Sequence, residues 1–89
     1  MQEAYGVAAF RSRQQVLWFE AALRRRGVPT EVISTPRDIA MGCGLSVRFP
    51  LDRAGDVRQA LRGFGTSNLI GLYRAEYRGG RLTVTPLGR

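Results

Sequence analysis

The residue in this sequence best suited to covalent chemistry is its single cysteine, Cys43, which stands between Gly42 and Gly44. Glycine has no side chain to cover a thiol, and it permits positive φ angles and close approach of a partner molecule. Successive backbone N–H groups in such a loop can also form a concavity that binds an anion. The triplet therefore favours an accessible, reactive thiol. The alternative is a structural cysteine, because a lone cysteine is often a small buried hydrophobic residue.

The charges around the cysteine affect its reactivity, because the deprotonated thiolate is the reactive form. A free thiol has a pKa of about 8.5, and nearby positive charge lowers it. Arg37 and Arg48 are the nearest cations in the sequence, so we expect them to stabilise a thiolate at Cys43. Asp38 either opposes this effect or holds Arg37 by an ion pair. Alternation along the following strand places both Ser46 and Arg48 on its outward face.

The composition excludes several familiar kinds of site. The chain has no histidine, which removes Ser-His-Asp and Cys-His nucleophilic sites and the common zinc ligand sets. With one cysteine, no intramolecular disulfide can form. No tract approaches the ~18 apolar residues of a membrane helix, and the first residues lack the layout of a signal peptide. We expect a cytoplasmic protein without a metal or cofactor and without a membrane contact.

The net charge is +7, and all 14 basic residues are arginine. Such a surface suits nucleic acid or an acidic protein partner, although codon bias in a GC-rich genome also favours arginine. The arginines are scattered, and their only run, residues 24–26, falls at the expected end of a helix, where cations suit the helix dipole. The sequence lacks the aromatic-basic signature of an RNA-recognition sheet. These features disfavour nucleic acid as the partner.

Hydrophobic periodicity predicts the elements that must position this segment. Ser12 is the expected N-cap of the first helix, and Gly27 its stop. Asp52 is the expected cap of the second helix, which Gly63 and Gly65 end. In chain order, the predicted elements are a strand over 5–10, a helix over 13–26, strands over 30–34 and 45–49, a helix from 52 to about 62, and strands over 69–77 and 82–84.

The order β-α-β-β-α-β indicates an α+β sandwich of the ferredoxin-like, split-βαβ type. Both helices then cover one face of an antiparallel sheet. The chain is short enough to be one domain spanning residues 1–89. The hairpin turn at 78–81 and the strand after it form a C-terminal extension, residues 78–89. The loop over 35–44, between the second and third strands, is longer than a hairpin needs, and long ordered loops tend to be functional.

Residues 35–45 resemble the signature of a family of small selenium/sulfur carrier-like proteins. The matching pattern is a Thr-Pro-Arg element, a short polar stretch, Gly-Cys-Gly and an apolar strand. Ala40 and Met41 make the stretch before the triplet more apolar here than in many members. The resemblance covers nearly the whole chain and fades after about Tyr73.

The resemblance implies that Cys43 carries a sulfur or selenium atom as a persulfide-type adduct, with Arg37 beside it. Thr35 and Pro36 belong to the same signature and are expected to position the loop, together with the flanking glycines. A thiolate can take the terminal atom from one partner and yield it to another by exchange. The implied partners are a protein donor and a protein acceptor, and the protein is then a carrier or thiol relay rather than a stand-alone enzyme.

Two other functions stay open. The domain can be a regulatory or interaction module that binds protein or RNA, with a structural cysteine. Tyr5, Tyr73 and Tyr77 would then lie on an open sheet face that stacks bases or pairs with a second copy in a homo-oligomer. The domain can also be a purely structural part of a larger complex.

Overall fold

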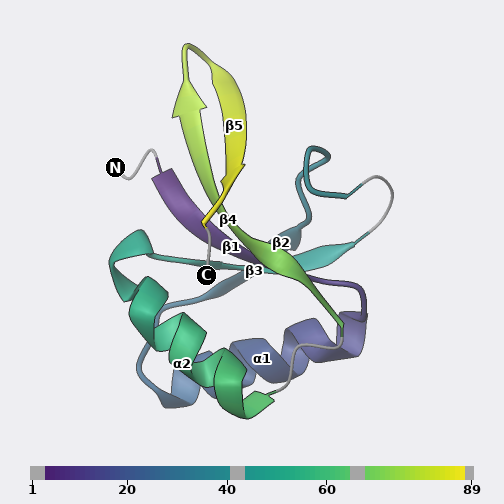
Figure 1. Ribbon diagram of the computed structural model, residues 1–89, viewed down its shortest axis with the longest axis vertical. Helices are drawn as coiled ribbons and strands as arrows, with labels where there is room; N and C mark the ends of the chain where they lie inside the picture. The colour runs from purple at the N-terminus through teal and green to yellow at the C-terminus, as the bar shows by residue number, and fades with distance from the viewer. Residues whose placement is uncertain (1–3, 41–43, 65–67, 88–89) are drawn as a thin grey trace.

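A computed structural model describes residues 4–40, 44–64 and 68–87 of the chain. The predictions for Gly42, Cys43 and Gly65 lie outside these residues. The elements are β1 (Ala4–Phe10), α1 (Arg13–Arg25), β2 (Glu31–Ser34), β3 (Leu45–Phe49), a 3₁₀ turn η1 (Leu51–Arg53), α2 (Ala54–Phe64), β4 (Leu69–Arg78) and β5 (Arg81–Pro86) (Figure 1).

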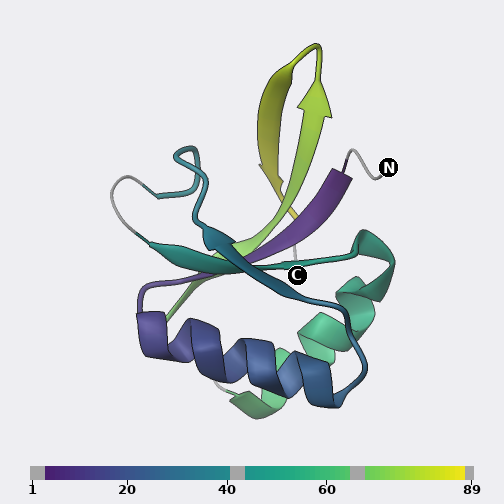
Figure 2. The same ribbon diagram turned by 180° about the vertical axis from the view of Figure 1, so that it is seen from behind.

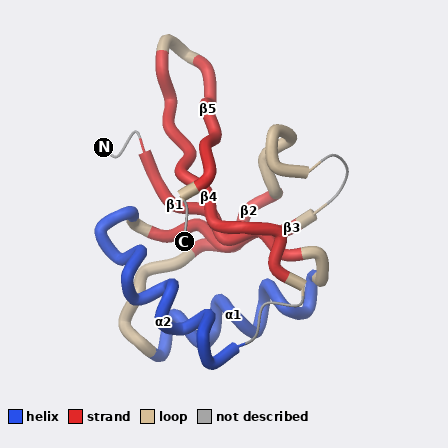
Figure 3. Tube along the Cα trace, viewed as in Figure 1, coloured by secondary structure: helices blue, strands red, loops and turns tan. Residues whose placement is uncertain are grey.

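The described strands form one antiparallel sheet in the order β2-β3-β1-β4-β5. Both helices lie on the same face of this sheet (Figure 3). The first four strands have the split-βαβ order, in which β3 separates β1 from β2 and β1 separates β3 from β4. The predicted fold class is therefore confirmed, and the extension adds β5 beside β4 at one edge.

Both ends of α1 follow from local sequence. The Ser12 hydroxyl accepts a hydrogen bond from the Gln15 N–H at 3.3 Å, as the predicted N-cap requires. At the other end Gly27 has a φ of 79°, and the Val28 N–H donates to the Leu23 carbonyl at 3.0 Å. This is the Schellman arrangement, in which a glycine in the left-handed region closes the helix. The prediction for α1 is confirmed to within one residue.

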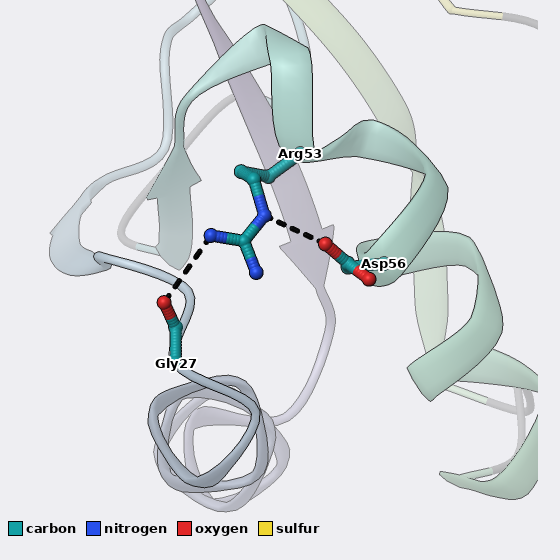
Figure 4. Close-up of polar contacts among 3 residues, drawn as sticks. All are labelled: Gly27, Arg53 and Asp56. Atoms are coloured by element: carbon teal, nitrogen blue, oxygen red, sulfur yellow. Dashed lines mark hydrogen bonds and ion pairs between the residues drawn. The ribbon is translucent and has the colours of Figure 1, made fainter.

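The start of α2 differs from the prediction. Asp52 lies in the 3₁₀ turn, which begins after Pro50 with the Arg53 N–H donating to the Pro50 carbonyl at 3.0 Å. Arg53 then fixes the helix start: its Nε lies 2.6 Å from Asp56 Oδ2, and its Nη1 donates to the Gly27 carbonyl at 3.3 Å (Figure 4). Asp52 therefore lies inside the turn rather than at the cap position, and Arg53 links the start of α2 to the end of α1.

The end of α2 also differs from the prediction, because the helix continues through Gly63 to Phe64. Glycine inside a helix costs about 1 kcal/mol relative to alanine. The Phe64 ring lies 5.3 Å from the Phe19 ring and 6.2 Å from the Phe10 ring, centroid to centroid. This aromatic packing stabilises the last turn and explains why the helix continues past Gly63.

The main core lies between the sheet and the helices. Alternate residues of β1 and β3 face the helices, and Gly6 of β1 lies directly opposite Phe49 of β3. A Cβ atom at Gly6 would clash with the Phe49 ring, so this position requires glycine. The buried members of the core are Ala8, Phe10, Val16, Phe19, Leu23, Val28, Val47, Phe49, Val57, Ala60 and Leu61.

Among the described residues, neither helix has the length and apolar character needed to cross a membrane.

Candidate functional site

The sheet face opposite the helices is also covered, but by other means. The loop that follows β2 and the β4–β5 hairpin rise on this side (Figure 2). Tyr5, Val7 and Ala75 are buried there, and Ile39 of the loop packs against them. Leu82 and Val84 of β5 contribute to the same cluster. We call this side the loop face.

Two contacts close the base of the loop. The Thr35 N–H donates to the Gly44 carbonyl at 2.9 Å, which extends the β2–β3 ladder by one residue pair. The Thr35 Oγ1 and Ser46 Oγ atoms lie 2.6 Å apart, and both residues are buried. The segment between these contacts is residues 36–43, of which the structure describes residues 36–40. We call these two contacts the loop clamp.

Ser46 corrects the sequence prediction. Its side chain lies on the face opposite the helices, as the alternation of β3 predicts, but its exposure is 0% rather than that of an outward residue. The reason is that Thr35 and the loop cover this face. A buried hydroxyl needs a hydrogen-bond partner, and Thr35 supplies it.

A turn at Pro36 shapes the first half of the loop. The Pro36 carbonyl accepts hydrogen bonds from the N–H groups of Ile39 at 3.0 Å and Ala40 at 3.3 Å. Ile39 packs against the buried cluster of the loop face, whereas Arg37 and Asp38 are exposed. The turn therefore anchors one apolar side chain and presents two charged ones to solvent.

Gly44 serves a close approach rather than an unusual backbone angle. Among the described residues, the glycines with positive φ are Gly27, Gly79 and Gly80. A Cβ atom at Gly44 would lie 3.2 Å from Thr35 Oγ1, inside the loop clamp. Gly44 therefore does not need glycine for a positive φ, but close packing against Thr35 favours glycine at this position.

The two arginines expected beside the thiol lie in different places. Arg37 is exposed on the loop, and among the described residues no ion pair joins it to Asp38. Arg48 lies on β3 four residues after Gly44, about 13 Å along a strand that rises ~3.3 Å per residue. Its guanidinium lies 4.1 Å from the centre of the Tyr5 ring and 3.9 Å from Glu31. This placement favours a structural role for Arg48, and the role expected of Arg37 stays a prediction.

A cavity of about 300 Å³ borders Arg48 at the end of the sheet away from the loop. It is lined by Tyr5, Pro29, Thr30, Glu31, Arg48, Phe49 and Pro50. Burial raises the pKa of the Tyr5 phenol above its ordinary value, and the charges of Tyr77 and Glu31 act in the same direction, while Arg48 opposes them.

The three tyrosines do not form an open stacking platform. Tyr5 is 7% exposed and Tyr73 is half-buried, while Tyr77 near the hairpin tip is 53% exposed. The loop and the hairpin occupy the space in which bases would stack. This geometry disfavours the sheet-based RNA-binding alternative.

Among the described residues, no group of three or more His, Cys, Asp or Glu side chains could hold a metal ion. Ser46 and Ile39 are the site residues that sequence reasoning missed. One signal was available: a branched apolar residue directly after the charged pair Arg37 and Asp38 indicates an anchor on an apolar surface.

The comparison with protein families gives one match. The family model described as "Putative Se/S carrier protein-like" matches residues 5–69, from β1 to the start of β4. No match was found among curated proteins or among solved structures. The matched segment includes the loop and both residues of the clamp, and the chain belongs to the Se/S carrier protein-like family.

Proposed function

We propose that this protein carries a sulfur or selenium atom on Cys43 between two protein partners. The observation that carries the proposal is the clamped segment between Thr35 and Gly44, which the family match includes and of which the structure describes residues 36–40. Its base is clamped by Thr35 and Ser46, and Ile39 anchors it on the loop face. A loop held at its base while Arg37 stays exposed suits a thiol that must meet another protein's sulfur.

For sulfur, the proposed step is an exchange without an external oxidant. The Cys43 thiolate attacks the terminal sulfur of a donor persulfide. The sulfur–sulfur bond of the donor breaks, the donor leaves as a thiolate, and a new sulfur–sulfur bond forms on Cys43. In the second step, a nucleophile of the acceptor takes the terminal sulfur and Cys43 leaves as a thiolate.

Arg37 has the role of favouring the attacking thiolate. It is exposed on the loop and has no ion pair with Asp38 among the described residues, so its charge is available to a neighbouring anion. Positive charge lowers a thiol pKa and raises the thiolate fraction at neutral pH. The same charge, within a net charge of +7, steers an acidic partner toward the loop.

The test is intact-mass spectrometry after incubation with glutathione persulfide under non-reducing conditions. We expect the mass to rise by one sulfur atom and to return to its original value on addition of dithiothreitol. Cys43→Ser is the control and should take up no sulfur. A protein whose cysteine takes up no sulfur while folded, but reacts after denaturation, would contradict the proposal.

A second measurement addresses the thiol itself. We expect the rate of iodoacetamide alkylation, plotted against pH, to have a midpoint below the ~8.5 of an unperturbed thiol. A midpoint at or above this value would mean that the loop does not activate the cysteine.

A further inference from the structure

Among the residues that the structure describes, the edge of the sheet beside β5 carries unpaired backbone groups. The Leu87 N–H donates to the Leu72 carbonyl at 2.9 Å, and the β4–β5 register continues from this pair without a bulge. In an antiparallel ladder, hydrogen-bonded and non-hydrogen-bonded pairs alternate. The odd-numbered residues of β5 therefore bond to β4. The N–H and C=O groups of Leu82 and Val84 point away from the sheet.

The two edges of the sheet differ in how well they are protected. The β2 edge has four residues, and Pro29 and Pro36 stand close to its two ends. Proline and short length are the usual means of blocking an edge strand. The β5 edge has six residues, and only its ends carry such features, Arg81 and Pro86. Its centre is uncharged, regular and open.

A groove of about 570 Å³ runs along this open edge. It is lined by Arg81, Leu82, Thr83 and Val84 on one side and by Asp38 on the other. Successive side chains of a strand point to opposite faces, so a groove lined by four consecutive residues follows the strand edge itself. Asp38 belongs to the signature loop. The groove therefore lies between the β5 edge and the loop.

We propose that this groove binds an extended segment of the protein that gives sulfur to Cys43 or takes it, as an added strand antiparallel to β5. The inference rests on the proposed function and names the docking site of its partner. The groove suits one added strand, which lies ~4.8 Å from β5. A second copy of this chain is the competing occupant, and the amide measurements below distinguish the two.

The register defines the chemistry of the segment. Two of its residues, separated by one, exchange hydrogen bonds with Val84 and Leu82, and their side chains lie on the loop face beside these two apolar side chains. The residue after them lies opposite Arg81, which is exposed. An apolar–any–apolar–acidic sequence therefore fits this edge, and the net charge of +7 attracts such an acidic segment.

The binding test uses an eight-residue peptide that contains Val-Thr-Val-Glu, titrated into ¹⁵N-labelled protein. We expect saturable shifts of the Leu82 and Val84 amide signals and at least tenfold slower hydrogen exchange at both. The control peptide carries an N-methyl group on its second valine, which removes a donor to the edge. We expect the control to bind at least tenfold more weakly.

Two substitutions at one position provide the matched variants. Val84→Pro removes an outward N–H without removing a β4–β5 hydrogen bond, whereas Val84→Thr keeps the N–H and the branched shape. We expect Val84→Pro to lose peptide binding at least tenfold and Val84→Thr to lose little. Arg81→Ala should weaken binding a few-fold, and added salt should remove that difference. If Val84→Pro does not fold, the comparison of the N-methylated and unmodified peptides on the wild-type protein still tests the inference.

A loading experiment separates this inference from the proposed function. The wild-type protein and Val84→Pro are each treated with glutathione persulfide and with a persulfide on a cysteine appended to the peptide. We expect equal loading of Cys43 by glutathione persulfide and at least fivefold slower loading of Val84→Pro by the peptide persulfide. If neither donor loads Cys43, the carrier function is refuted. The amide shifts and hydrogen exchange of Leu82 and Val84 then still test the docking inference.

Three results would overturn the docking inference. The first is an absence of protection at Leu82 and Val84 at saturating peptide. The second is equal binding of the N-methylated and unmodified peptides. The third is protection of the same amides without peptide that increases with protein concentration, which would assign the edge to a second copy of this chain.

Discussion

Both faces of the sheet are covered over the central strands β1 and β3, but different kinds of interaction cover them. On the helix face, apolar side chains from α1 and α2 interlock with β1 and β3, and Phe49 fits over Gly6. On the loop face, a smaller apolar cluster lies beside a buried pair of hydroxyls, Thr35 and Ser46. Apolar burial is cumulative and non-directional, whereas the hydroxyl pair depends on two specific partners. We therefore expect the helix face to supply most of the free energy of folding, and the loop face to fix the position of the loop.

The largest expected effect comes from breaking the helix face. Phe49→Ala should lower the free energy of unfolding by about 3–5 kcal/mol, because it removes a buried ring and leaves a cavity. Urea unfolding followed by circular dichroism measures this change. The folded fraction should alkylate Cys43 at the wild-type rate, and a large change in that rate would contradict the division between the faces.

The next effect comes from breaking the loop clamp. Thr35→Val leaves the Ser46 hydroxyl buried without its partner and should cost about 1–3 kcal/mol in unfolding free energy. Adding Ser46→Ala should restore much of that loss, because no polar group is then left unpaired. A double-mutant cycle by urea unfolding tests the coupling. Strictly additive effects would mean that the hydroxyl pair contributes nothing specific.

A substitution at Gly44 tests the same clamp from its other side. Gly44→Ala places a Cβ atom 3.2 Å from Thr35 Oγ1. We expect the free energy of unfolding to fall by about 1 kcal/mol, the lower end of the usual range for overpacking. The alkylation rate of Cys43 should change as well. In a Thr35→Ala background both effects should disappear, because the crowded atom is gone. A stabilising outcome for Gly44→Ala in the wild-type protein would show that the close approach is unimportant.

A pair of arginine substitutions separates reactivity from stability on the loop face. Arg37→Ala should slow alkylation of Cys43 at neutral pH and leave the melting temperature nearly unchanged, because the side chain is exposed. Arg48→Ala should leave alkylation unchanged and cost about 0.5–1 kcal/mol, through loss of its contact with the Tyr5 ring. The opposite pattern would identify Arg48 as the thiolate partner and Arg37 as a structural tether.

The smallest expected effect is a pH dependence from Tyr5. Because its pKa is raised in the folded state, the unfolded state loses this proton first as the pH rises. The contribution of Tyr5 to stability is therefore complete below pH ~10 and is lost as the pH rises through the folded-state pKa. Urea unfolding at alkaline pH should show a flatter decline in Tyr5→Phe than in the wild-type protein. Parallel declines would exclude this linkage.

Local signals predicted most of the fold. The cap at Ser12, the stop at Gly27 and the alternation over 45–49 depend on neighbouring residues alone, and the structure confirms them. The predictions that failed involve distant residues. Arg53 at the start of α2 bonds to the Gly27 carbonyl at the end of α1, and Phe64 extends the helix past Gly63 by contacts with rings far away in the chain.

The candidate site was predictable in part for the same reason. The sequence indicated the loop, its signature and Cys43, and the family match to residues 5–69 supports the signature. The roles of the cysteine, of Gly42 and of Arg37 stay predictions. Periodicity places Ser46 on the correct face, but no periodicity can tell that a loop covers that face.

The sequence by itself determined the element order, the ferredoxin-like class and the family signature, because capping, periodicity and turn chemistry act over a few residues. Only the tertiary structure decided which polar groups are buried together and which backbone groups stay open. The loop clamp joins residues eleven apart, Thr35 and Ser46. The groove beside β5 is lined by Asp38 and by Arg81–Val84, more than forty residues further along the chain. Such pairings arise when a twisted sheet brings a loop and a hairpin to the same face, which local propensity does not encode.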